Sequence, residues 1–249
     1  MVGVESMRYL IDFSYSGENF NGYQKQPLLR TVQKEIEDVL KMINQKDVKI
    51  CSAGRTDAKV SAFHQMAHFD LDKDIKPYKL KGALNGYLPP DIYINDVKIV
   101  DDDFHARYMA KSKTYRYTIN TGVYNPLLRN VIYQYCKPLD VSKMKEAIKY
   151  FIGTHDFTTF SCAEDKRENK IRTIFDAKVE SNDSLIAITF KGSGFLKYQV
   201  RNMVGILIDV GNGKTDSCII PKLIDKKDRK EAKATAPAEG LTLIDVSYN

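Results

Sequence analysis

Alternation between apolar and polar residues is the feature that most restricts the fold of this chain. In residues 8–15, Tyr9, Ile11, Phe13 and Tyr15 lie on one face and polar side chains on the other. A period of two residues is that of a β-strand with one buried face. Further segments predict strands or strand-like stretches and together indicate a sheet; they are residues 48–52, 66–71, 92–100, 111–119, 174–180, 185–191 and 241–248.

Segments whose apolar residues have helical spacing lie between these strands. A helix beginning after Thr31 is predicted by an apolar stripe formed by Val32, Ile36, Val39, Leu40 and Ile43. Four more segments are expected to be helical, the last of them a solvated charge run; they are residues 79–87, 141–151, 195–208 and 226–233. Because no Pro/Gly/Ser-rich linker divides the chain, its two halves are expected to share one continuous sheet.

Charge and cysteine content limit the classes of function. The 249 residues carry 38 Lys and Arg against 32 Asp and Glu, a net charge of +6 that permits a polyanionic partner. The four cysteines are far apart and form no Cys-x-x-Cys pair, which opposes a zinc site or a disulfide scaffold and fits a reducing cytoplasm. No segment approaches the roughly 20 apolar residues that a membrane span needs, so we expect a soluble, cytoplasmic protein.

A polar loop between two predicted strands is the first candidate site. Gly54 permits a tight backbone, and Arg55 and Asp57 are two residues apart, so in extended chain their side chains point to the same side. A surface turn with a solvated ion pair is the commoner meaning of this pattern. The residues by themselves leave both interpretations open.

Three other segments carry side chains that suit RNA or an anion. The loop at residues 20–27 mixes aromatic residues with amides, and it could stack on a base or cover a core edge. In strand 111–119, Lys113 and Tyr115 share one face, although a core tyrosine is the commoner case. Arg201 lies in an apolar helix and needs a partner, because burying it unpaired would cost on the order of several kcal/mol.

Metal and nucleotide-cofactor chemistry have little support. His64 and His68 have the spacing of a zinc-protease helix, but Gln65 occupies the place of the required glutamate and the following residues indicate a strand. The chain also lacks the glycine-rich fingerprints of nucleotide-binding enzymes, which opposes a small-molecule α/β enzyme. We expect no metal and no cofactor.

Four ordered motifs together resemble the TruA family of tRNA pseudouridine synthases. They span nearly the whole chain and are residues 53–58 (Ala-Gly-Arg-Thr-Asp-Ala), 104–107 with 115–117, 200–205 (Val-Arg-Asn-Met-Val-Gly) and 236–241. Shorter matches fall in the expected order at residues 20–26, 84–85, 155–157 and 172–174. The chain departs from the family at Lys59, Ser61 and Tyr23, which stand where glycine, histidine and tryptophan are usual.

The resemblance implies an α+β fold in which two similar α/β halves share a mostly antiparallel central sheet flanked by helices, with the active cleft between the halves. Residues 1–110 would form the half with the Asp57 loop, and residues 111–249 the half with Tyr115 and Arg201. The implied protein is a cytoplasmic homodimer without cofactor or metal. It would isomerise uridine to pseudouridine in the tRNA anticodon arm, at positions 38, 39 and 40.

The resemblance also implies roles for single residues. Asp57 would be the nucleophile, on ribose C1′ or uracil C6, or would promote loss of the C2′ proton. Tyr115 would stack on the uracil and take part in proton transfer, and Arg201 would hold Asp57 ionised. Arg55 would help displace the target nucleotide. The residues expected to bind RNA are Arg55, Lys59, Tyr23, Gln24, Arg107 and Lys113.

One alternative is a protein with the same fold and no catalytic activity. The departures at Lys59 and Ser61 would allow a non-catalytic tRNA-binding or RNA-folding protein. Retention of Asp57, Tyr115 and Arg201 favours the enzyme. The alternative predicts salt-sensitive binding with no altered base.

Overall fold

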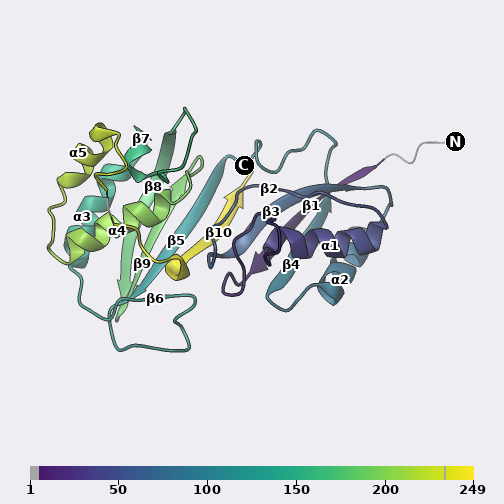
Figure 1. Ribbon diagram of the computed structural model, residues 1–249, viewed down its shortest axis with the longest axis horizontal. Coiled ribbons are helices and arrows are strands. Elements are labelled where there is room, and N and C mark those ends of the chain that lie inside the picture. The colour runs from purple at the N-terminus through teal and green to yellow at the C-terminus, as the bar shows by residue number, and fades with distance from the viewer. Residues whose placement is uncertain (1–5, 233) are drawn as a thin grey trace. The chain divides into compact units, whose positions relative to one another are not determined.

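The computed structural model describes residues 6–232 and 234–249 (Figure 1). The chain forms two compact units. Unit 1 comprises the residues up to Lys111 together with Leu243–Asn249, and unit 2 comprises Ser112–Thr242. Each unit combines antiparallel strands with helices, so the expected mixed α/β class with mostly antiparallel pairing is confirmed.

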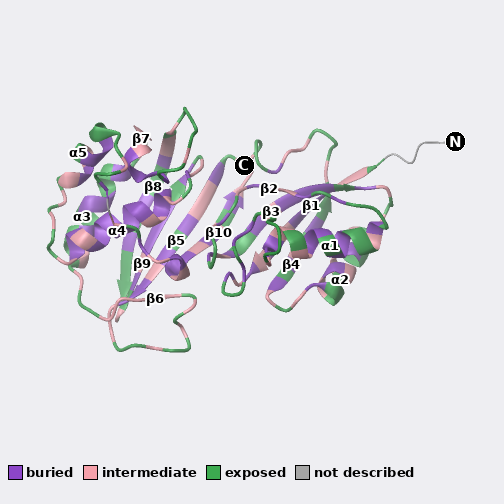
Figure 2. Cartoon of the chain, viewed as in Figure 1, coloured by how far each residue is buried: buried purple, intermediate pink, exposed green. Residues whose placement is uncertain are grey.

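Unit 1 is a twisted sheet with the strand order β4-β1-β3-β10, and β2 pairs with β3. Its strands are β1 (Met7–Tyr15), β2 (Cys51–Ser52), β3 (Ser61–Leu71), β4 (Ile92–Ile99) and β10 (Leu241–Ser247). The helices are α1 (Val32–Asn44) and α2 (Pro77–Tyr87), which lie on one face of the sheet (Figure 1). That face is buried (Figure 2), as the alternation in β1 predicts, because Tyr9, Ile11 and Phe13 are all fully buried.

Unit 2 repeats the plan with the strand order β5-β9-β8-β7, and β6 pairs in parallel with β5. Its strands are β5 (Ser112–Asn120), β6 (Tyr133–Gln134), β7 (Gly153–Asp156), β8 (Ile171–Asn182) and β9 (Leu185–Gly192). The helices are α3 (Val141–Ala147), α4 (Gln199–Gly211) and α5 (Ile219–Lys226), with short 3-10 helices at Ile148–Phe151, Thr158–Phe160 and Ala238–Gly240. The strands predicted at residues 174–180 and 185–191 pair as the hairpin β8–β9, and Asp183 supplies the positive φ of its turn, at 50°.

Three local expectations are wrong. The strand expected at residues 48–52 is paired only at β2, and residues 153–156, where no strand was expected, form β7 and pair with β8. The charge run at 226–233 is not a helix, because α5 ends at Lys226 and the described residues after it form turns. Lys227 adopts a left-handed conformation, φ 49°, which stops α5; residue 233 lies outside the described residues.

The last residues of the chain also correct the expected division at 110/111. We placed them in the C-terminal half, but Leu243–Asn249 cluster with unit 1. The Tyr248 hydroxyl donates to the Ala106 carbonyl at 2.8 Å, and the Lys111 amide donates to the Ser247 carbonyl at 2.8 Å. Contacts between residues so distant in sequence leave no local pattern. The order of the segments along the chain therefore assigned these last residues to the wrong half.

Two glycines inside helices provide a matched test of packing. Gly82 in α2 is exposed, and an added Cβ would meet nothing within 4 Å, so Gly82→Ala should stabilise the protein by about 0.5–1 kcal/mol through helix propensity. At Gly205 in α4 a Cβ would lie 2.7 Å from the Ala234 carbonyl oxygen, so Gly205→Ala should destabilise by about 1–3 kcal/mol. Urea unfolding of both variants measures the difference; equal effects at the two positions would contradict the packing described.

Candidate functional site

Asp57 lies half-buried in the loop that joins β2 to β3. The loop closes on itself, because the Val60 amide donates to the Asp57 carbonyl at 3.2 Å. At its start, the Ala53 amide donates to the Met66 carbonyl at 2.7 Å, which continues the β2–β3 pairing. The loop therefore leaves the sheet with its two ends fixed.

The turn after β1 packs directly against this loop. At Gly17 an added Cβ would collide with the backbone of Val60, so only glycine allows the approach. Gly22 has φ +94°, and its Cβ would lie 3.2 Å from the Ala58 amide nitrogen. The Tyr23 amide donates to the Thr56 carbonyl at 3.1 Å. Contact between two backbones leaves the Asp57 loop little freedom to move.

A buried polar network underlies the same loop. The Tyr15 hydroxyl and Thr56 Oγ1 are 2.7 Å apart, and Gln65 Nε2 and Ser52 Oγ both donate to the Gly54 carbonyl, at 3.0 and 2.9 Å. Tyr15 is 5% exposed and Gln65 is fully buried. Burial raises the pKa of Tyr15 to about 12, so its hydroxyl remains protonated at neutral pH. We did not predict this support from the sequence, although a glutamine among the apolar residues of β3 is a visible signal.

The two unusual loop residues have clear conformational roles. Lys59 has φ 67°, in the left-handed region that glycine adopts without strain, which explains why the resembling family has glycine there. Ser61 begins β3, and its Oγ accepts a hydrogen bond from the Gly17 amide at 3.0 Å. Ser61 therefore helps to join the two packed loops.

The residues expected to bind RNA differ in their exposure. The exposed residues are Arg55, Lys59, Gln24 and Arg107. Burial raises the pKa of the Cys51 thiol, and the positive charges of Arg107 and Arg55 oppose this rise. Tyr23 is 2% exposed and lies in the core. The expectation that Tyr23 contacts RNA is therefore wrong, because its ring is occupied by packing.

A cluster of potential metal ligands adjoins this surface. Within the described part of the chain, Cys51, His68 and His105 place their ligand atoms within 4.8 Å of one another. His68 Nδ1 accepts a hydrogen bond from the Ala106 amide at 3.1 Å, and His105 Nδ1 accepts one from the Arg107 amide at 3.2 Å. Each neutral ring therefore carries its proton on Nε2. A histidine that binds a metal ion through Nε2 has no proton there and usually donates a hydrogen bond from Nδ1 instead. The hydrogen bonds indicate a structural cluster.

In unit 2, Tyr115 lies on the buried face of β5. Its side chain is 8% exposed, and its ring meets the edge of Phe195 at 5.2 Å between centroids. Lys113, two residues earlier, is half-buried on the same face. Packing against Phe195 fixes the plane of the Tyr115 ring.

Arg201, in the first turn of α4, is bound to the closing segment of the chain. Its Nε donates to the Ala236 carbonyl at 2.8 Å, and the Ala236 amide donates back to the Arg201 carbonyl at 3.0 Å. Asn202 Oδ1 accepts from Thr235 Oγ1 at 2.7 Å, and the guanidinium of Arg201 lies over the ring of Tyr198 at 5.0 Å. The two motifs at residues 200–205 and 236–241 thus form one structure around Arg201.

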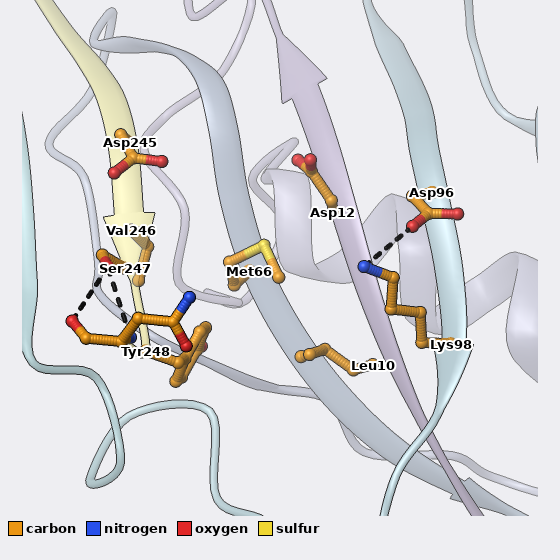
Figure 3. Close-up of a pocket in the computed structure, with 10 residues that line it drawn as sticks. Leu10, Asp12, Met66, Asp96, Lys98, Asp245, Val246, Ser247 and Tyr248 are labelled. Carbon is orange, nitrogen blue, oxygen red and sulfur yellow. Dashed lines mark hydrogen bonds and ion pairs between the residues drawn. The ribbon is translucent and has the colours of Figure 1, made fainter.

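A cavity of about 390 Å³ lies on the face of the unit 1 sheet that carries Leu10 and Asp12 (Figure 3). Three carboxylates line it, those of Asp12, Asp96 and Asp245, together with Lys98. None of the predicted site residues lines it, and its acidic character does not suit RNA phosphates.

Comparison with known proteins gives one consistent result. The model of a family described as tRNA pseudouridine synthase matches residues 13–109 and 147–249. The chain is 46% identical over 245 residues to tRNA pseudouridine synthase A of Streptococcus agalactiae serotype Ia, covering 97% of this chain and 95% of the relative. It is 43% identical to the protein of the same name from Staphylococcus carnosus (95% and 89% covered) and 42% identical to that from a Geobacillus species (98% and 99%).

The conformation of Lys59 predicts an increase in stability on substitution by glycine. Lys59→Gly removes the strain of a left-handed residue, offset in part by the greater freedom of glycine in the unfolded chain, for a net gain of about 0.5–1 kcal/mol. Lys49→Gly is the control, because Lys49 is exposed and has no positive φ; it should lower stability slightly. Urea unfolding measures both, and a loss of stability at position 59 would refute the conformational explanation.

The network beneath Asp57 predicts a change in the pH dependence of stability. Tyr15→Phe should cost about 1 kcal/mol at neutral pH through the lost hydrogen bond to Thr56. Because the pKa of Tyr15 in the folded protein, about 12, exceeds the ordinary tyrosine pKa of 10.0, the contribution of its hydroxyl to stability is complete below pH 10 and is lost as the pH rises towards 12. The variant should lose stability less steeply across that window. The exposed Tyr78→Phe should match the wild type in both respects, and an unchanged slope for Tyr15→Phe would contradict the buried hydroxyl.

Proposed function

Because the chain belongs to the tRNA pseudouridine synthase family, we propose that Asp57 is the nucleophile with which it converts uridine to pseudouridine in the anticodon arm of tRNA. The enzyme is an isomerase that acts on tRNA. The observation that carries the assignment of Asp57 is its half-buried place on a loop fixed by backbone contacts and by a buried network.

The reaction requires one bond to break and another to form. The bond from ribose C1′ to uracil N1 is cleaved, the uracil rotates, and C5 joins C1′; C5 gives up its proton and N1 gains one. A carboxylate suits this chemistry because it can attack C1′ or C6, or assist loss of the C2′ proton. Each of these routes needs an ionised carboxylate in a fixed position, which is what the rigid loop would supply for Asp57.

Tyr115 and Arg201 complete the proposal from unit 2. The ring of Tyr115, held in plane by Phe195, would stack on the uracil, and its hydroxyl would take part in the proton transfer that finishes the product. Arg201 would keep Asp57 ionised, since a nearby positive charge lowers the pKa of a carboxylate. Its anchorage to Ala236 supports this role, because a fixed guanidinium can hold a fixed carboxylate.

Four cations and one amide would hold the RNA. Arg55 would help displace the target nucleotide, at a cost of about a few kcal/mol of lost stacking and pairing. Lys59, Arg107 and Lys113 would bind phosphates, and the exposed Gln24 would hydrogen-bond to the nucleic acid.

We further propose that the protein is a homodimer in the cytoplasm. Support for self-association comes from the segment before β6, where Val123 is 92% exposed and Leu127 is 89% exposed, since exposed apolar patches mark contact surfaces. All four cysteines are free thiols, in keeping with a reducing compartment. Among the described residues, no helix has the length and apolar character needed to cross a membrane.

Tritium release tests the chemistry. The protein is incubated with unmodified tRNA transcripts that carry tritium at uracil C5 and have uridines at positions 38–40, and release of tritium reports formation of the new C–C bond. Asp57→Asn should abolish release while tRNA affinity changes by no more than a few-fold, because the amide keeps the shape and loses the nucleophile. Asp47→Asn, at an exposed site paired with Lys41, should release tritium at the wild-type rate.

Two outcomes would contradict parts of the proposal. Turnover by Asp57→Asn would show that the nucleophile is wrong. Salt-sensitive binding of several tRNAs by the wild-type protein with no tritium release would favour a non-catalytic tRNA-binding protein on the same scaffold.

A further inference from the structure

Tyr108 has the most exposed aromatic side chain among the described residues, at 79%. We propose that Tyr108 is a stacking platform for an unpaired base of the bound tRNA, a contact that deepens the proposed function and rests on it. Burial normally stabilises an aromatic ring, so one held out in solvent on a nucleic-acid enzyme needs a reason.

The ring of Tyr108 is exposed but held in place. It stacks on His105 with 4.1 Å between ring centroids and an angle of 28° between the planes. With one face against the imidazole, the high exposure leaves the other face open to solvent. A flat, oriented and open π-face is what stacking by a nucleobase requires, and every base can use it.

His105 is itself anchored to the sheet of unit 1. Its Nδ1 accepts hydrogen bonds from the amides of Arg107 and Tyr108, at 3.2 and 3.3 Å, and its Nε2 lies 3.6 Å from Cys51 Sγ. Its ring also meets the edge of His68 at 4.8 Å, and His68 is only 7% exposed. The cluster of Cys51, His68 and His105 thus fixes the platform before RNA arrives, which reduces the entropy lost on binding.

The positive charges near Tyr108 favour a nucleotide as the group that stacks on its ring. Arg107 is the adjacent residue, and Arg55, on the Asp57 loop, acts with it on the Cys51 thiol, so both cations lie on this side of unit 1. Their exposed guanidinium groups suit the phosphates on either side of a stacked base. Asp102 and Asp103 are exposed in the same segment and interact with Arg8. Because their carboxylates would repel phosphates, Arg55 and Arg107 would bind the phosphates instead.

Equilibrium binding of the full-length protein to an unmodified tRNA transcript tests the inference. Tyr108→Ala and Tyr108→Leu should weaken the affinity about 5- to 100-fold, because both lose the π-face, and Tyr108→Phe should stay close to the wild type. The slope of log affinity against log salt should be unchanged in the Tyr108 variants, because no phosphate contact is lost. In Arg107→Gln the slope should fall by about one.

Tyr78→Ala is the matched control, since Tyr78 is 67% exposed on α2 and should bind tRNA as the wild type does. Wild-type affinity in Tyr108→Ala and Tyr108→Leu would overturn the inference while leaving the proposed function intact. So would a change in oligomeric state with unchanged tRNA affinity, which would make Tyr108 a protein contact. Failure of the wild-type protein to bind tRNA would overturn the proposed function and this inference with it.

Discussion

Close contact between the backbones of two loops is the constraint on which the Asp57 site depends. The turn after β1 and the loop after β2 approach so closely that Gly17 leaves no room for a Cβ against Val60. The carbonyl of Thr56 accepts from the Tyr23 amide on one side, and the Thr56 hydroxyl meets Tyr15 beneath. A carboxylate on such a support has few alternative positions, so little free energy would be needed to orient it for the proposed attack.

A comparable arrangement surrounds Arg201 in unit 2. The first turn of α4 and the closing segment exchange hydrogen bonds through Arg201 and Ala236, and Gly205 lets the two backbones meet at Ala234. In both units a side chain with a proposed function is held by a segment distant in sequence. Rigidity of this kind costs stability at single positions, as the left-handed Lys59 shows, and the packing around the loops compensates for that strain.

Sequence patterns predicted most elements because one face of each is buried. The alternation in β1 and the stripe in α1 follow directly from the cores that they face. The failures have physical causes of a different kind. Tyr23 is indistinguishable in sequence from a base-stacking tyrosine, but packing places it in the core. Tyr108 lies outside the predicted strands and helices, and its side chain is exposed. Exposure of an aromatic residue outside a periodic element is decided by neighbours that its own segment does not contain.

The sequence by itself determined the mixed α/β class, the position of the Asp57 loop between strands, and the ordered motifs, because these depend on local periodicity and residue identity. Only the tertiary structure decided that Leu243–Asn249 join unit 1, that Gln65 and Tyr15 support the loop, and that His105 carries Tyr108. Those features arise from contacts between residues distant in sequence. Such contacts form only when the chain folds, and they leave no periodic trace in the order of the amino acids.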